Sequence, residues 1–130
     1  MAERIVVVAA VIEQNGRFLV ARRLAGTHLA GHWEFPGGKV HDGESQEAAM
    51  AREIAEELSS GISQLREIFH TVHSYPERTV ELHFYRGELT GTPQPLLGQE
   101  LRWISRDEFA SLEFPAADAA LIASLMHAGL

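Results

Sequence analysis

Three glutamates lie close together in the segment at residues 37–57, which reads GGKVHDGESQEAAMAREIAEE. If residues 45–58 form an α-helix, side chains three and four positions apart are neighbours, so Glu53, Glu56 and Glu57 share one face. Carboxylates this close together repel one another unless water or a cation separates them. The spacing therefore predicts either a solvated acidic surface or a bound cation.

The residues that precede these glutamates favour the cation. Gly38, Glu44 and Arg52 stand at fixed distances before and along the helix, a coincidence that a solvated acidic surface does not require. The ligands would all be oxygen atoms, because the chain has no cysteine and this helix has no histidine pair. Oxygen ligands select a hard ion, so we expect Mg²⁺, with Mn²⁺ as a substitute, in preference to Zn²⁺.

The helix that positions the glutamates is predicted to begin after Ser45, whose hydroxyl is a suitable N-cap. Arg52 stands four residues before Glu56 and is expected to pair with it. Glu44 lies on the preceding glycine loop and approaches the acidic face if that loop folds back. The opposite face is predicted to pack through Ala48, Ala51, Ile54, Ala55 and Leu58.

This segment resembles the Nudix box, which is Gly, five residues, Glu, seven residues, Arg-Glu, an aliphatic residue, any residue, Glu-Glu, any residue, Gly and an aliphatic residue. Ser59 and Ser60 stand where the pattern ends in Gly and the aliphatic residue, and Gly61-Ile62 follow two positions later. We interpret this as a helix exit lengthened by two residues. The residues that match are Gly38, Glu44, Arg52, Glu53, Ile54, Glu56 and Glu57.

A second segment, LAGHWEFPGGKV, is similar to the MutT branch of the family, the nucleoside triphosphate pyrophosphohydrolases that remove damaged or surplus nucleotides. In that branch the matching arginine, histidine and phenylalanine contact substrate, and an arginine after a Pro-acid turn lies near the base. For Trp33 we expect ordinary core packing instead. The substrate-binding candidates are Arg23, His28, Glu34, Phe35, Lys39, Arg78 and Asp118.

Two positions depart from the MutT pattern. Leu97 stands where the pattern has a further loop acid, and Glu100, the nearest acid, is either its replacement or an exposed residue of no consequence. Asp118 stands where similar enzymes for oxidised guanine often have asparagine. It is either a base-facing residue or the N-cap of the last helix.

The other segments read mainly as strands and turns. Residues 5–12 are apolar throughout, which is typical of a strand buried on both faces. Asn15-Gly16 predicts a hairpin turn, and Ser105 with Glu108 forms a capping box. With the resemblance, this pattern predicts one α/β domain over residues 1–130, a Nudix fold with a mixed β-sheet sandwiched between α-helices. The predicted strands are residues 5–12, 17–22, 65–75, 79–89 and 101–104, and the predicted helices are residues 45–58 and 117–127.

Composition limits the partners. The chain has 130 residues, 45% of them hydrophobic, and a formal net charge of −7, which disfavours a nucleic-acid polymer as partner. The first apolar run is too short to span a bilayer, so we expect no membrane segment. The absence of cysteine is compatible with the cytoplasm, where we expect the protein to act. A monomer and a homodimer both remain open.

The resemblance implies hydrolysis of a nucleoside triphosphate to the monophosphate and pyrophosphate. Mg²⁺ would be held by Glu53, Glu56, Glu57 and a carbonyl of Gly37 or Gly38, and Glu53 is our choice as general base. Two alternatives stay open, namely hydrolysis of nucleoside diphosphate derivatives and nucleotide binding without turnover. In this scheme Arg52 orients the glutamates, Arg23 and Lys39 hold phosphate, and Phe35 and Asp118 face the base.

The base preference depends on Asp118. Asparagine offers both a donor and an acceptor, which match the O6 acceptor and N7 hydrogen of 8-oxoguanine. An ionised aspartate offers only acceptors, which suit the exocyclic amine of cytosine. We expect 8-oxo-dGTP as the first substrate, because burial can keep the acid neutral and Arg78 can help to read O6. CTP, dCTP or a modified cytosine nucleotide is the alternative.

Overall fold

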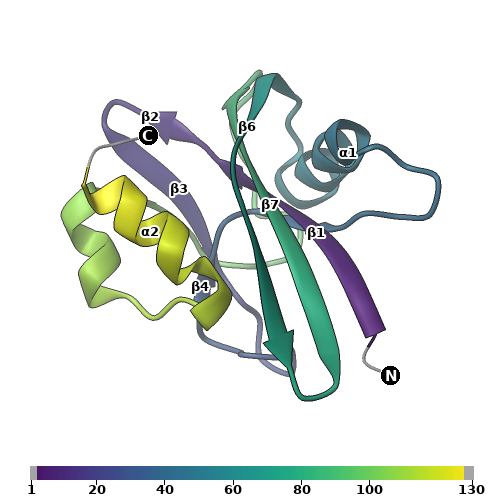
Figure 1. The fold of residues 1–130 in the computed structure, drawn as a ribbon. Helices are drawn as coiled ribbons and strands as arrows, with labels where there is room; N and C mark the ends of the chain where they lie inside the picture. Colours follow the sequence, from purple (N-terminus) through teal and green to yellow (C-terminus); the bar gives the residue numbers. More distant parts are fainter. Residues whose placement is uncertain (1–2, 128–130) are drawn as a thin grey trace.

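The computed structural model describes residues 3–127, whose strands form two sheets (Figure 1). The mixed sheet has the order β5-β1-β7-β6, in which β1 and β7 are parallel and the outer pairs are antiparallel. The antiparallel sheet has β3 at its centre, paired with β2, β4 and β8. The elements are β1 (Glu3–Val11), β2 (Glu13–Gln14), β3 (Arg17–Arg22), β4 (Trp33–Glu34), β5 (Gly37–Lys39), α1 (Gln46–Leu58), β6 (Ile62–Tyr75), β7 (Arg78–Leu89), β8 (Leu101–Ile104), the 3₁₀-helices η1 (Arg106–Ser111) and η2 (Ala116–Asp118), and α2 (Ala119–Met126).

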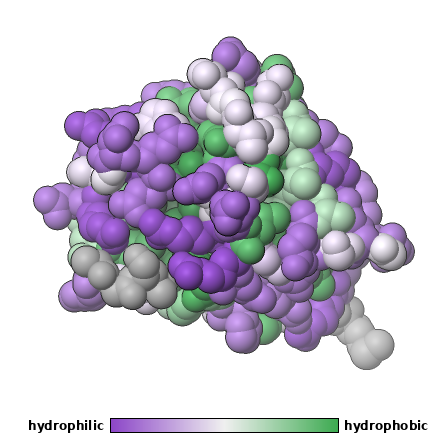
Figure 2. Space-filling model, turned by 90° about the horizontal axis from the view of Figure 1, so that it is seen from above, coloured by the Kyte–Doolittle hydropathy of each residue, from purple (hydrophilic) through white to green (hydrophobic). Residues whose placement is uncertain are grey.

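Helices α1 and α2 lie on opposite sides of the strands, which confirms the predicted α/β arrangement (Figure 1). The sequence did not predict that the strands divide into two sheets. That division follows from the pairing of β8 with β3, which are far apart in the chain and carry no local signal for each other. Seen from above, the surface is largely hydrophilic, with apolar atoms showing between the polar side chains (Figure 2).

Strand β1 lies between β5 and β7 and is buried on both faces, as its apolar sequence predicts. Val8 and Ala10 pack toward α1, in a core that includes Met50. Ala9 and Val11 point the other way, into the core beneath α2. Alternation along one strand therefore supplies both hydrophobic cores.

Helix α1 begins where the sequence predicts, because the Ser45 hydroxyl accepts a hydrogen bond from the Ala48 N–H at 3.1 Å. The predicted apolar face is partly wrong. Ile54 and Leu58 are buried, but Ala48, Ala51 and Ala55 are exposed. The buried face is rotated and includes Ala49 and Met50 instead, so the exposed alanines contribute helix propensity and not core contacts.

The helix exit is not lengthened, contrary to the prediction. Helix α1 ends at Leu58, and Ser59 takes the left-handed conformation with φ 55° and ψ 37°. Glycine is favoured at such a position because it has no Cβ, which explains why the Nudix pattern places glycine there. The buried Ser60 hydroxyl donates to the Gly61 carbonyl and accepts from the Gly91 N–H, which fixes the path to β6.

The remaining turns agree with the sequence. Asn15 and Gly16 have φ of 52° and 77°, as a two-residue hairpin turn requires. The capping box at Ser105 and Glu108 is present and opens η1. The predicted helix at residues 117–127 begins with η2 and continues as α2. Asp118 stands at the N-cap position of α2, but its side chain makes no capping hydrogen bond, so its alternative interpretation as an N-cap is wrong.

Candidate active site

Helix α1 lies against β5, and two glycines allow this close approach. A Cβ on Gly38 would lie 2.5 Å from the Glu53 Cδ and 2.6 Å from both of its carboxylate oxygens. A Cβ on Gly37 would lie 2.0 Å from the Val8 carbonyl oxygen, on the neighbouring strand. Only glycine therefore lets the Glu53 carboxylate pack against the strand backbone. We call Glu44, Arg52, Glu53, Glu56 and Glu57 the acidic cluster.

Arg52 connects the acidic cluster, chiefly through Glu44. Its Nε and Nη2 donate to the two carboxylate oxygens of Glu44 at 2.8 and 2.9 Å, and its Nη1 donates to Glu53 at 2.8 Å. Nη2 also donates to the Lys39 carbonyl at 2.9 Å. The predicted pair with Glu56 is present but is the longest contact, at 3.4 Å, because the loop before α1 folds back and offers Glu44 for bidentate pairing.

The partners of Glu44 stabilise its charged form. Hydrogen bonds from Arg52 and from the His41 N–H lower the pKa of Glu44 to about 2. The same contact with Glu44, followed by that with Glu53, raises the pKa of Arg52 further above its usual value. Glu44 and Arg52 are therefore a permanent ion pair over the whole physiological pH range.

Glu57 lies in a different environment. Burial, followed by the hydrogen bond and charge of Glu53, raises the pKa of Glu57 well above its usual range, while a hydrogen bond from the Gly37 N–H lowers it. Without a cation, the raised pKa of Glu57 therefore favours its neutral form. Among residues 3–127, no three acidic or histidine side chains converge on one coordination position, and the Glu56 side chain is 58% exposed.

The donor set fits a hard divalent cation. The neighbouring carboxylates of Glu53 and Glu57, on α1 where it packs closely against the glycines of β5, offer oxygen ligands alone. A cation bound by both would favour the ionised form of Glu57 and offset the repulsion from Glu53 that contributes to its raised pKa. The chemistry of these residues thus agrees with the ion expected from the sequence.

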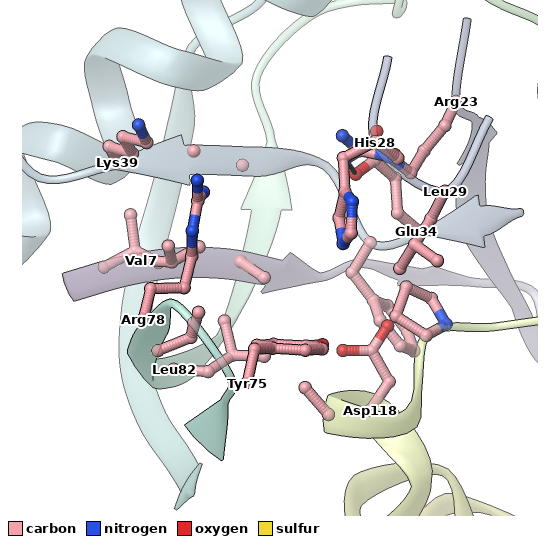
Figure 3. A pocket seen from close by; sticks show the side chains of 18 residues that line it. Val7, Arg23, His28, Leu29, Glu34, Lys39, Tyr75, Arg78, Leu82 and Asp118 are labelled. Carbon is pink, nitrogen blue, oxygen red and sulfur yellow. Dashed lines mark hydrogen bonds and ion pairs between the residues drawn. The ribbon is translucent and has the colours of Figure 1, made fainter. Parts of the chain in front are cut away.

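A pocket of about 270 Å³ opens beside β5 (Figure 3). Side chains from several strands and from the loops between them line it. Lys39 and Arg78 lie toward one end, where both side chains are exposed. His28, Glu34, Tyr75 and Asp118 lie toward the other, which we call the Asp118 end. The structure brings all the predicted substrate-binding residues to this pocket: Arg23, His28, Glu34, Phe35, Lys39, Arg78 and Asp118.

Asp118 is the most unusual acid of the pocket. It is 6% exposed and makes no hydrogen bond that would offset this burial. Burial, followed by the nearby charge of Glu34, raises the pKa of Asp118 to about 7, and Arg23 opposes the rise. Near neutral pH this carboxyl is therefore a mixture of a form that donates and accepts hydrogen bonds and a form that only accepts.

Arg23 and Glu34 form an ion pair between the Asp118 end of the pocket and the acidic cluster. Arg23 Nη1 donates to Glu34 at 2.7 Å, and Arg23 Nε donates to the His28 carbonyl at 2.5 Å. Burial raises the pKa of Glu34 even though Arg23 lowers it. Both side chains line the pocket and also an adjoining cleft that reaches Glu57. This pair thus links the Asp118 end to the acidic cluster.

Phe35 lines the pocket and is also part of the hydrophobic core. It is 4% exposed, and its ring packs against Phe84, Phe109 and Phe114 with centroids 5.7 to 5.9 Å apart. Phe35 therefore forms part of the fixed pocket wall and is not a free stacking platform. Trp33 is buried in the same core, as predicted.

The family model described as NUDIX domain matches residues 7–124. The chain belongs to the Nudix family. Within the Nudix family its relatives are MutT-like, and solved structures described as MutT share its fold.

Three Nudix relatives illustrate the similarity. The CTP pyrophosphohydrolase of Escherichia coli K12 is 39% identical over 114 residues, which cover 87% of this chain and 83% of that protein. The 8-oxo-dGTP diphosphatase of Haemophilus influenzae is 37% identical over 132 residues, which cover 98% and 96%. The solution structure of the E. coli ORF135 protein superposes with a TM-score of 0.85 at 35% identity, covering 97% and 91%.

The departure from the MutT pattern in the loop before β8 concerns two residues, Leu97 and Glu100, which have distinct settings. Leu97 is 54% exposed and borders the cleft that reaches Glu57. Glu100 is exposed and pairs with Arg22 at 3.7 Å, outside that cleft. Glu100 therefore lies in the wrong place to replace the missing acid, unless the loop moves.

Gln99 was missed by the sequence analysis. Its side chain is 6% exposed, donates to the Glu57 carbonyl at 3.1 Å and accepts from the Leu97 N–H at 2.9 Å. The Leu96 N–H donates to the same Glu57 carbonyl, so the loop caps the end of α1. A polar residue in a loop gives no local sign of such a role.

Tyr75 was also missed, although the turn that follows it was singled out. It is the last residue of β6, and its ring lies along the pocket.

As for membranes, none of the helices within residues 3–127 is both long and apolar enough to cross a bilayer.

Proposed function

We propose that this MutT-like Nudix protein hydrolyses a nucleoside triphosphate to the monophosphate and pyrophosphate. The observation that carries the proposal is that the pocket adjoins a cleft leading to Glu57 of the acidic cluster. Arg23 and Glu34 line both the pocket and that cleft. A base held at the Asp118 end can extend its phosphates toward the acidic cluster. Relatives named 8-oxo-dGTP diphosphatase and CTP pyrophosphohydrolase support the same reaction. The proposal includes a cytoplasmic location and a small-molecule substrate.

Nudix hydrolases generally need a divalent metal, and we propose Mg²⁺ here, with Mn²⁺ as a substitute. Glu53, Glu56, Glu57 and a carbonyl of Gly37 or Gly38 would hold it. When bound, the ion would neutralise phosphate charge and lower the pKa of an attacking water. Glu56 is exposed and pairs with Arg52, so it would have to leave Arg52 to join Glu53 and Glu57.

The residues of the chain then take complementary roles. Glu53, which lies between Arg52 and the Gly38 backbone, accepts a proton from the attacking water. The permanent ion pair of Arg52 and Glu44 keeps Glu53 oriented. Lys39, together with Arg23, attracts the phosphates.

For the base, 8-oxo-dGTP is our first choice. The raised pKa of Asp118 leaves a large protonated fraction at neutral pH, and this fraction presents the donor and acceptor pair of an asparagine. Such a carboxyl matches the O6 acceptor and N7 hydrogen of 8-oxoguanine. Arg78 lines the same pocket but lies toward its other end, so its help in reading O6 stays a prediction.

A cytosine nucleotide is the second candidate, because two acids meet at the Asp118 end. Glu34 and Asp118 lie toward the same end of the pocket, and the charge of Glu34 contributes to the raised pKa of Asp118. Ionised, they offer acceptors alone, which suit the exocyclic amine of cytosine. The CTP pyrophosphohydrolase relative, at 39% identity, supports this candidate.

A nucleotide panel tests the proposal. The protein is incubated with Mg²⁺ and 8-oxo-dGTP, dGTP, CTP, dCTP or a nucleoside diphosphate sugar, and the products are identified. We expect the monophosphate and pyrophosphate from the triphosphates, with 8-oxo-dGTP fastest. Turnover of the diphosphate sugar alone would assign the other hydrolase activity, and binding without any product would leave a nucleotide-binding module.

A further inference from the structure

Tyr75 faces Asp118 across the pocket. The tyrosine ends β6, whereas the aspartate ends η2, and the hydroxyl of one points toward the carboxyl of the other (Figure 3). The ring of Tyr75 is held by His73, at a centroid distance of 4.6 Å, and meets the His28 ring edge-on at 6.1 Å. The position of the phenol is thus fixed by the fold, and its polar group is directed at the acid.

The charged groups around Asp118 either pair with one another or lie farther away, so the Tyr75 phenol is the remaining polar group that faces the Asp118 carboxyl. Glu34 on β4 and Arg23 after β3 form their own ion pair, and Arg78 on β7 lies toward the other end of the pocket. Asp118 itself makes neither a capping hydrogen bond nor an ion pair with any other residue from 3 to 127. Burial, followed by the charge of Asp118, raises the pKa of Tyr75, so the phenol keeps its proton at neutral pH and remains a donor.

We propose that Tyr75 determines base specificity by controlling the form in which the Asp118 carboxyl meets the base. This inference rests on the proposed function. The two groups face each other without a hydrogen bond among residues 3–127. Once the carboxyl ionises, the phenol is placed to donate to it, which would stabilise the acceptor-only form that favours the exocyclic amine of cytosine. Without that hydroxyl, Asp118 stays protonated to higher pH and presents a donor beside an acceptor, which favours 8-oxoguanine.

The test is Tyr75→Phe, assayed as the ratio of kcat/KM for 8-oxo-dGTP to kcat/KM for dCTP over a range of pH. In the wild type this ratio falls as pH rises through the titration of Asp118. We expect Tyr75→Phe to move the midpoint of the fall upward by about one pH unit, and to raise the ratio at pH values above the wild-type midpoint by about tenfold. Effects of pH on the metal and the phosphates cancel in the ratio.

Tyr85→Phe is the matched control, because it removes the same atom elsewhere. The Tyr85 hydroxyl donates to Gln46 at 2.7 Å on the α1 side, away from the pocket. Its ratio and midpoint should equal those of the wild type. A second control is Tyr75→Phe in an Asp118→Asn background, where no carboxyl remains to titrate and the pH profile of the ratio should not shift.

Two results would overturn the inference. One is an unchanged midpoint in Tyr75→Phe. The other is an equal change of the ratio in the presence and absence of the Asp118 carboxyl, which would show that the ring acts by packing alone. A titration of the Asp118 carboxyl carbon by NMR, without nucleotide, separates this failure from that of the proposed function. There the midpoint should rise by about one pH unit in Tyr75→Phe even if no triphosphate is hydrolysed.

Discussion

The acidic cluster and the Asp118 end both gather acids, but they balance the charge by different means. In the acidic cluster, Arg52 bonds directly to Glu44 and Glu53, and the pKa of Glu44 falls to about 2. At the other end Asp118 has no bonded cation, and burial raises its pKa to about 7. Direct partners therefore fix the charges of Glu44 and Arg52 in the acidic cluster, whereas burial makes the charge of Asp118 adjustable near neutral pH. We expect the first region to serve the reaction and the second to distinguish bases.

Glu57→Gln should have the largest effect and should act on the reaction alone. Loss of this carboxylate should lower kcat by roughly 10²- to 10⁴-fold with saturating Mg²⁺, equally for 8-oxo-dGTP and dCTP. Without metal, the variant should be as stable as the wild type or slightly more stable, because repulsion with Glu53 is relieved. Glu47→Gln, on the exposed first turn of the same helix, is the control. Unchanged turnover in Glu57→Gln would remove the metal assignment.

Asp118→Asn should change how the free energy of unfolding depends on pH, which tests whether burial controls the charge at the Asp118 end. The pKa of Asp118 is about 7 in the folded state but close to 3.9 in the unfolded state, so between these values the folded state binds more protons. The free energy of unfolding contributed by this group therefore falls as pH rises from about 4 to about 7 and then levels off. Relative to the wild type, Asp118→Asn should gain up to about 4 kcal/mol over that window, measured by urea unfolding.

A difference between Asp118→Asn and the wild type that stays constant with pH would show that Asp118 titrates normally. The same variant should retain 8-oxo-dGTP hydrolysis and lose activity on dCTP, since its amide offers a donor and only one acceptor. Loss of both activities together would instead place Asp118 in the common reaction and weaken the distinction between the two regions.

How much of each region could be predicted from the sequence depends on whether its residues are close together in the chain. The acidic cluster comes from one helix and the loop before it, so helical spacing places Glu53, Glu56 and Glu57 on one face, although Glu56 does not converge with the other two. The pairing of Arg52 with Glu44 was underestimated, because it depends on how the loop folds back. The two-sheet arrangement likewise rests on pairing between strands remote in the chain.

At the Asp118 end, the side chains come from four separate segments, and no spacing relates them. The family resemblance supplied His28, Glu34 and Asp118, whereas Tyr75 has no equivalent signal in the sequence. Phe35 was predicted to face the base, but its packing with three other phenylalanines depends on η1 and the segment before η2. Long-range assembly, and not local pattern, sets this half of the pocket.

Ser59→Gly tests a smaller feature of the acidic cluster, the end of its helix. Because Ser59 holds φ at 55°, glycine should raise the free energy of unfolding by about 1 kcal/mol. Ser45→Gly makes the same substitution at the other end of α1, where it should lower stability by a few tenths of a kcal/mol. Destabilisation by Ser59→Gly in urea unfolding would mean that the serine side chain, not the backbone conformation, matters there.

Glu100→Gln should have the smallest effect. Its contact with Arg22 is exposed and long, so kcat should stay within about twofold of the wild type and stability within about 0.5 kcal/mol. A rate reduced tenfold or more, with base preference unchanged, would show that the loop moves and that Glu100 replaces the acid missing at Leu97.

The most direct test of the distinction between the two regions is the base preference of the wild type as a function of pH. The ratio of kcat/KM for 8-oxo-dGTP to kcat/KM for dCTP should fall by at least about tenfold as pH rises through about 7, because Asp118 loses the proton that makes it a donor. Titrations within the acidic cluster affect both substrates and leave the ratio unchanged. A ratio independent of pH, or a tenfold preference for dCTP at every pH, would contradict the account.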